Sequence, residues 1–171
     1  MPNPMILLNV TSFVANSANQ PGAPFCPITV PGITCANGNG NAPLIGFVAG
    51  TSNAVWVKSP NPTGGPGGKP VPVDIDIMII SSPPVGGPNF ALTPTDVRFS
   101  KTTPGGDSNG NANFGKNAPV GNIITITDKW TDKGRHGNGS APVWKFSVAV
   151  KDSVSGNTGW VDPTIENADD L

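Results

Sequence analysis

The sequence predicts one all-β domain spanning residues 1–171, an antiparallel β-sandwich of immunoglobulin-like or jelly-roll type with long loops rich in Gly, Pro and Asn. Short runs of alternating apolar and polar residues recur along the chain, and this period of two is that of a strand with one buried face. No long run shows the period of a helix. The 22 glycines and 20 prolines supply turns between strands, and many short strands joined by turns are typical of two-sheet folds.

The alternation is clearest in the stretch from Val143 to Ile165, which predicts a β-hairpin. Its first arm places four large apolar side chains on one face and alternates them with small or charged ones: Trp144, Phe146, Val148 and Val150 against Lys145, Ser147, Ala149 and Lys151. The segment Asp152–Gly159 is rich in Ser, Asn and Gly, which favours a turn. The chain then returns through Trp160 and Val161. We expect the last hairpin of the domain here, with one face in the core.

Four short apolar segments are candidates for strands in the first third of the chain: Met5–Val14, Ile28–Ile33, Pro43–Ala49 and Ala54–Lys58. The first is apolar and rich in residues that suit a strand. Pro31 interrupts the second, and because proline cannot donate to a ladder, it confines this run to an edge strand or a loop. The last two flank the turn Gly50–Asn53, and Trp56 is the expected core anchor of the pair.

Three further strands are expected before the C-terminal hairpin: Val71–Ile80, Phe90–Ser100 and Asn122–Thr127. In the first of these, one face is apolar throughout while the other changes from polar to apolar, so the strand is expected to begin at the rim and end in the interior. Ile124 and Ile126 share one face of the third. Three segments with little to bury are predicted to be loops: Ser59–Pro70, Lys101–Pro119 and Asp128–Ser140.

Charged residues are sparse and unevenly placed. They make up 12% of the chain with a net charge of −1, which favours neither nucleic acid nor an anionic membrane as a partner. Residues 1–57 contain no Asp, Glu, Lys, Arg or His, and the first charge is Lys58. Two interpretations stay open: a polar, Asn-rich surface that dispenses with charge, or a contact surface for other subunits.

The sequence also indicates where in the cell the protein is located and whether its cysteines are reduced. No apolar run reaches the roughly 18 residues of a membrane span, and no Lys or Arg precedes the short apolar run Met5–Leu8, so no signal peptide is recognisable. A cytoplasmic location is expected, and export by another route stays open. Cys26 and Cys35 are expected to be reduced, because one pair of cysteines forms neither a metal-ligand pattern nor a disulfide framework.

Residues suited to catalysis are few. His136 is the only histidine, and it lies in a predicted loop among glycines, Arg135 and Asn138. No nucleophile accompanies it at a recognisable spacing, and the chain has no tyrosine. The glycines of Thr63–Gly68 do not link a strand to a helix, so they form no phosphate-binding loop. We therefore predict no enzyme, no catalytic residue and no cofactor.

Two groups of oxygen ligands are candidates for cation binding. Asp74 and Asp76 share a strand face, where an ordinary exposed face is favoured over a cation site. Oxygen-bearing side chains also alternate through a Gly-rich loop at Asp107, Asn109, Asn111 and Asn113. This spacing resembles the opening of a calcium loop, but Ala118 stands where the bidentate Glu belongs. A weak site or none is expected, and no metal ligand is assigned.

Trp160 has two interpretations. Exposed, its ring would stack on a sugar; buried, it would close the core. Burial is the favoured expectation.

The string WKFSVAVKDSVSGNTGWVDPTIEN, Trp144–Asn167, resembles the end of small bacterial proteins of the DP-EP family. Within it, GWVDPTI is similar to the closing strand of inclusion-body proteins of the PixA and AidA type. Asp162 and Pro163 match the pattern, whereas no Glu-Pro follows Glu166. The resemblance implies a β-sandwich protein without an established enzymatic activity, of a kind that accumulates as intracellular protein bodies.

The sequence thus predicts a non-enzymatic structural or self-assembling protein that forms a homo-oligomer, filament or inclusion through residues 1–57. The alternative is a lectin-like or calcium-assisted ligand-binding module that uses the polar loops around Asp107 and Asp132, with Trp160 as a further candidate contact and carbohydrate as the candidate ligand of the lectin-like form.

Overall fold

A computed structural model of the chain describes residues 3–13, 33–36, 44–47, 54–59, 71–101, 113–129, 143–161 and 164–167. In these residues the fold is all-β and contains no helix. None of them therefore forms a helix long and apolar enough to cross a membrane.

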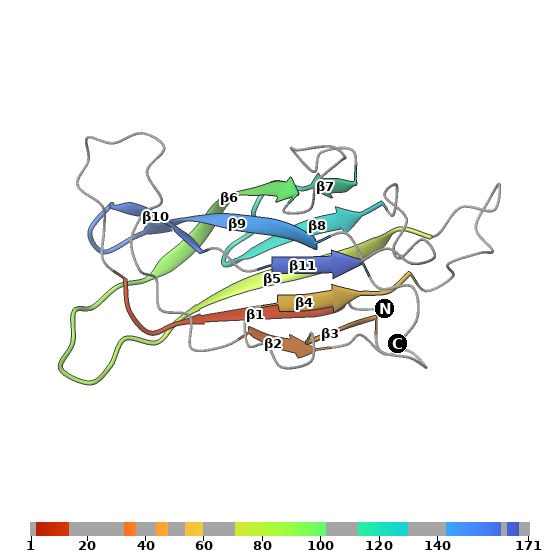
Figure 1. The fold of residues 1–171 in the computed structure, drawn as a ribbon. Helices are drawn as coiled ribbons and strands as arrows, with labels where there is room; N and C mark the ends of the chain where they lie inside the picture. The colour runs from red at the N-terminus through yellow and green to blue at the C-terminus, as the bar shows by residue number, and fades with distance from the viewer. Residues whose placement is uncertain are drawn as a thin grey trace.

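The described strands form two sheets (Figure 1). The first sheet has the order β2 (Ile33–Ala36), β1 (Met5–Val10), β5 (Val73–Ser81), β8 (Ile123–Asp128) and β7 (Phe114–Lys116). The second has the order β3 (Ile45–Phe47), β4 (Ala54–Val57), β11 (Thr164–Asn167), β9 (Val143–Asp152) and β6 (Leu92–Lys101). The strand β10 (Thr158–Val161) pairs with β9 on the same side as β11.

The buried faces of the two sheets share one hydrophobic core. Strand β5 buries every second residue from Val73 to Ile79, and β9 does so from Trp144 to Val150, as the alternation predicts. Aromatic rings join the sheets: Phe99 of β6 stacks on Phe114 of β7 at 4.3 Å between ring centroids. The core therefore closes between the ends of both sheets at β6 and β7.

The strands predicted from alternation are present, and their bounds move by a few residues. The run Ile28–Ile33, for which an edge strand or a loop is expected, lies outside the described residues except for Ile33, which begins β2. Strand β7 is a correction, because residues 114–116 lie within the predicted loop Lys101–Pro119. Three residues are too few to show a period of two, so only pairing with β8 identifies this strand.

The pairing is not purely antiparallel. Strand β1 pairs in parallel with β5, and β4 pairs in parallel with β11. The other pairs of the described strands are antiparallel. Both parallel pairs join strands far apart in the chain, since a parallel neighbour needs a long crossover connection. Alternation within a strand carries no information about its neighbour's direction.

The predicted C-terminal hairpin is present and extends further than its two expected arms. Val161 pairs with Val148, and Thr164 pairs with Lys145, so the register on β9 does not shift between β10 and β11. The two strands therefore continue one line along β9. Gly156 in the connecting turn has φ of 77°, a conformation that costs other residues free energy.

Trp56 is not the core anchor that the sequence predicts. Its neighbours Val55 and Val57 are fully buried, whereas Trp56 is half-buried on the outer face of β4. Its ring lies against Gly46, its pairing partner on β3. The Lys58 ammonium is 5.7 Å from the ring centroid. Successive side chains of a strand point to opposite faces. Because Val55 and Val57 point into the core, Trp56 between them points outward.

Replacing Gly46 with alanine is expected to displace the Trp56 ring. An added Cβ would lie 2.4 Å from Cζ2 of Trp56, so the indole must move away from the sheet, at a cost of about 1–3 kcal/mol. Gly115→Ala is the matched control, because its added Cβ meets the flexible end of Lys129 at 3.3 Å and Thr127 Cβ at an ordinary contact distance of 3.6 Å. Urea unfolding of both variants tests this, and equal stabilities would contradict it.

Candidate association surface

The described strands of the charge-free first third of the chain lie together on one side of the molecule. Residues 1–57 contribute β1 and β2 to the first sheet and β3 and β4 to the second. Among the described strands β2 and β3 end their sheets, and they lie next to one another (Figure 1). The uncharged stretch of sequence therefore supplies the strands at one end of both sheets, and the ammonium of Lys58, the first charged residue, lies over the Trp56 ring at its border. We call this end the charge-free side: described residues 3–13, 33–36, 44–47 and 54–57.

Phe47 provides an exposed aromatic ring on the charge-free side. It pairs with Val55, which is fully buried, so alternation directs Phe47 toward the core face of β3. Even so, Phe47 is 40% exposed, because β3 has no described neighbour beyond it in its sheet. The other large exposed apolar residues of the described part lie outside the named strands: Val85, Val120 and Val154. Phe47 alone among the four belongs to a sheet.

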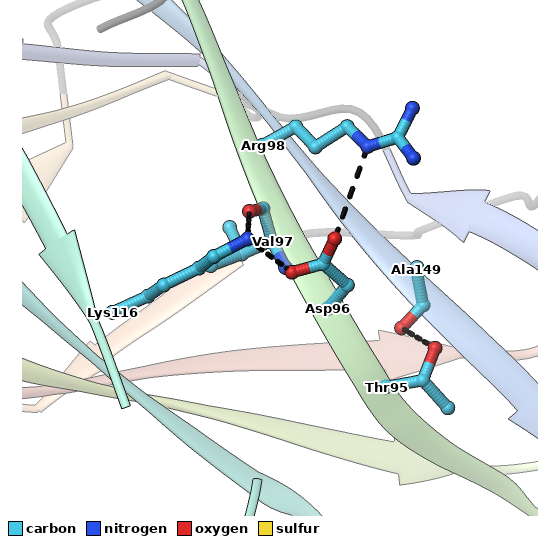
Figure 2. Close-up of polar contacts among 6 residues, drawn as sticks. All are labelled: Thr95, Asp96, Val97, Arg98, Lys116 and Ala149. Carbon is cyan, nitrogen blue, oxygen red and sulfur yellow. Dashed lines mark hydrogen bonds and ion pairs between the residues drawn. The ribbon is translucent and has the colours of Figure 1, made fainter. Parts of the chain in front are cut away.

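The opposite side, at β6 and β7, carries charges and is tied together by them. Lys116 of β7 forms an ion pair with Asp96 of β6, and Nε of Arg98 lies 3.8 Å from Oδ2 of Asp96 (Figure 2). The two sides of the molecule therefore differ in chemistry: the strands of one side contain no charged residue, and those of the other are bridged by ion pairs.

The Asp74 and Asp76 carboxylates accept hydrogen bonds from neighbouring strands. Thr127 Oγ1 donates to Asp74 Oδ1 at 2.6 Å, and Thr125 Oγ1 donates to Asp76 Oδ1 at 2.7 Å. Asn3 Nδ2 also donates to Asp76 Oδ1, at 3.2 Å. The threonine bonds join β5 to β8, which is a structural use of both carboxylates. No group of three or more His, Cys, Asp or Glu residues gathers in the described part of the chain.

Trp160 is neither fully buried nor free. It is half-buried on β10, and the guanidinium of Arg98 lies 4.6 Å from its ring centroid. This cation covers a face that a sugar would need for stacking, and the contact itself is favourable. Trp160 therefore belongs to the outer surface of the second sheet rather than to the core that the sequence favours.

Most candidates in the polar loops lie outside the described residues: Cys26, Thr63–Gly68, Asp107, Asn109, Asn111, Asp132 and His136. Asn113 is described and is 1% exposed. Its amide donates to Asp128 Oδ1 at 3.1 Å, so it fastens the start of β7 to the end of β8. Cys35 lies in β2. Asn113 thus has a structural role, and the calcium-loop prediction stays a prediction.

The sequence predicts that residues 1–57 form a contact surface, but it gives no indication of the roles of Phe47, Asp96 or Lys116. Phe47 lies in a predicted strand, yet its exposure depends on which strand ends the sheet. Lys116 lies in a predicted loop, and its partner is contributed by the other sheet. No pattern of neighbouring residues in the sequence indicates the exposure of Phe47 or the ion pair of Lys116 with Asp96.

No family model matches this chain, and no curated protein matches it. The resemblance of the C-terminal hairpin to the DP-EP and inclusion-body families stays a prediction. The functional assignment therefore depends on the geometry of the two sides.

Proposed function

We propose that this protein is a non-enzymatic structural protein, a β-sandwich of immunoglobulin-like or jelly-roll type, which assembles with copies of itself through the charge-free side. The observation that carries the proposal is the collection of β1, β2, β3 and β4 on one side without a single charged residue. A solvated surface normally carries about 25–35% charged residues. Interface centres, in contrast, are depleted of charge and enriched in aromatic residues.

Phe47 is the expected anchor of this interface. It combines an aromatic ring, 40% exposure and a position at the end of the second sheet. Burying it against a second copy would remove its apolar surface from water without removing any charge from water. An assembly built on such a side would need no cofactor.

We expect Phe47→Lys to weaken self-association by about tenfold or more, because a lysine at the anchor places an unpaired charge in an apolar contact. Multi-angle light scattering of untagged protein over a hundredfold concentration range, with negative-stain microscopy, measures the assembly. Val120→Lys is the matched control, since Val120 is an exposed valine in the turn before β8 and belongs to none of the strands β1 to β4.

The wild-type protein and Val120→Lys should form the same assemblies, and Phe47→Lys should shift toward monomer with its thermal unfolding retained. A wild-type chain that is monomeric at every concentration would refute the proposal. Equal assembly by Phe47→Lys would remove Phe47 as the anchor.

A further inference from the structure

Of the described strands that end a sheet, β6 is the longest, running over ten residues from Leu92 to Lys101. Among the described strands it pairs only with β9. The backbone groups on its other side therefore face no described strand, and a long edge of this kind readily adds one. Natural proteins close such edges with charges, prolines and bulges, and β6 has all three.

The contacts that block the free edge of β6 involve the backbone of Val97. Its N–H donates to Asp96 Oδ1 at 2.8 Å, and its carbonyl oxygen accepts from Lys116 Nζ at 3.0 Å (Figure 2). The same ammonium pairs with Asp96 Oδ1. Both backbone groups of Val97 are thus occupied by side chains in place of a neighbouring strand. Val97 is 1% exposed and belongs to the hydrophobic core. We call Asp96 and Lys116 the edge clamp.

The position of the edge clamp depends on the fold of both sheets. A register shift between Pro94 and Asp96 interrupts the pairing with β9 just before the edge clamp, and Pro94 itself has no N–H to donate. Lys116 reaches β6 from β7, which belongs to the other sheet. Its side chain is 47% exposed and that of Asp96 is 38% exposed. An ion pair this exposed adds little to stability, so opening it leaves the fold intact.

We propose that the edge clamp gates a second association surface, and that with the clamp open β6 pairs antiparallel with β6 of a second copy. The two-fold axis would pass through Val97, whose outward N–H and C=O would exchange bonds with those of its copy. This register sets Asp96 of each chain opposite Arg98 of the other, a pair of opposite charges on each side of the axis. Because the charges of β6 complement those of a second β6 in this register, we infer that the partner at this edge is a second copy of the chain.

The edge clamp would therefore confine assembly to the charge-free side and keep the charged side closed. Because the clamp shares no residue with the charge-free side, this second surface goes beyond the proposed function. Its test is made in the Phe47→Lys background, where association through the charge-free side does not contribute. The same substitutions are also measured in the chain that keeps Phe47, which shows whether the charge-free side and the β6 edge associate independently. Failure of one proposal therefore leaves the other testable.

Lys116→Met keeps the length of the side chain and removes the ammonium. We expect the weight-average mass to double at high protein concentration while thermal unfolding is unchanged, and we expect the Val97 amide to stay protected from hydrogen exchange in the dimer. Lys145→Met is the matched control, because Lys145 is an exposed lysine on β9 outside the edge clamp. In the Phe47→Lys background, the Lys145→Met protein should remain monomeric. Lys116→Arg should remain monomeric as well, because it keeps a positive charge beside Asp96.

Arg98→Glu added to Lys116→Met tests the register. It sets a carboxylate opposite Asp96 of the copy, and like charges directly opposite destabilise a strand pair. The dimer should therefore be lost, and Val97 should exchange faster. A Lys116→Met protein that stays monomeric overturns the proposal. Dimers that persist with Arg98→Glu overturn it equally, because they would form through another surface.

Discussion

Replacing Trp144 with alanine is expected to lower the free energy of unfolding by about 3–5 kcal/mol, the largest loss that we expect from a single substitution. Among the described residues, Trp144 is the largest of the fully buried side chains. Its ring meets that of Phe114 at 5.5 Å between centroids and 85° between planes. Because β9 and β7 belong to different sheets, the substitution would leave a cavity between them.

The neighbouring rings cannot fill that cavity easily. Phe114 is stacked on Phe99, and Phe99 is 6.5 Å from Phe146, so the four rings hold one another in place. Close packing of this kind relaxes only in part after a large side chain is removed. Trp144→Phe retains an aromatic ring at the centre of the group and should recover much of the loss.

Urea unfolding followed by circular dichroism measures both variants. Lys145→Ala is the control, since it changes the adjacent exposed residue of the same strand and should alter stability by no more than about 0.5 kcal/mol. A Trp144→Ala protein as stable as this control would show that the ring group does not join the sheets.

Asp152→Ala is expected to have the second largest effect, a loss of about 2–4 kcal/mol. Asp152 ends β9 and is 2% exposed. Its carboxylate accepts hydrogen bonds from the N–H groups of Ala91, Val154 and Ser155 and from the Ser155 hydroxyl. It therefore holds the hairpin turn and fastens it to the segment before β6. Alanine would leave all four donors without this acceptor.

The same hydrogen bonds set the response to acid. Burial by itself raises the pKa of Asp152, but the bonds from Ser155, Ala91 and Val154 together outweigh it and lower the pKa below the ordinary 3.8. A lowered pKa in the folded state gives stability that is fully present above the unfolded-state value and is lost as the pH falls through the folded-state value. The advantage of the wild-type protein over Asp152→Asn should therefore shrink below about pH 4.

Urea unfolding of the wild-type protein, Asp152→Ala and Asp152→Asn at neutral pH and at a series of acidic values measures both effects. Asparagine keeps one acceptor oxygen and should lose less than alanine. Ser153→Ala is the nearby control, because its hydroxyl makes only an exposed bond to the Ala91 carbonyl oxygen at 3.3 Å. A stability gap between wild type and Asp152→Asn that stays constant into acid would contradict the assigned cause.

The sequence by itself determined the strands that alternate. Trp144 to Val150 and Val73 to Ile79 bury the residues that a period of two assigns to one face, because side chains on a strand must point to opposite faces whatever lies beside it. The C-terminal hairpin follows from the same rule and from the turn residues after Asp152. The absence of charge before Lys58 is also plain in the sequence.

Only the tertiary structure decided which strands are neighbours and which end a sheet. That order exposes Phe47, sets the Trp56 ring against Gly46 of the neighbouring strand, and gathers β1 to β4 on one side. It also brings Lys116 of a three-residue strand to Asp96 of the other sheet. The reason is that periodicity records the environment of a residue within its own strand, whereas pairing order and the ends of sheets depend on contacts between residues far apart in the chain.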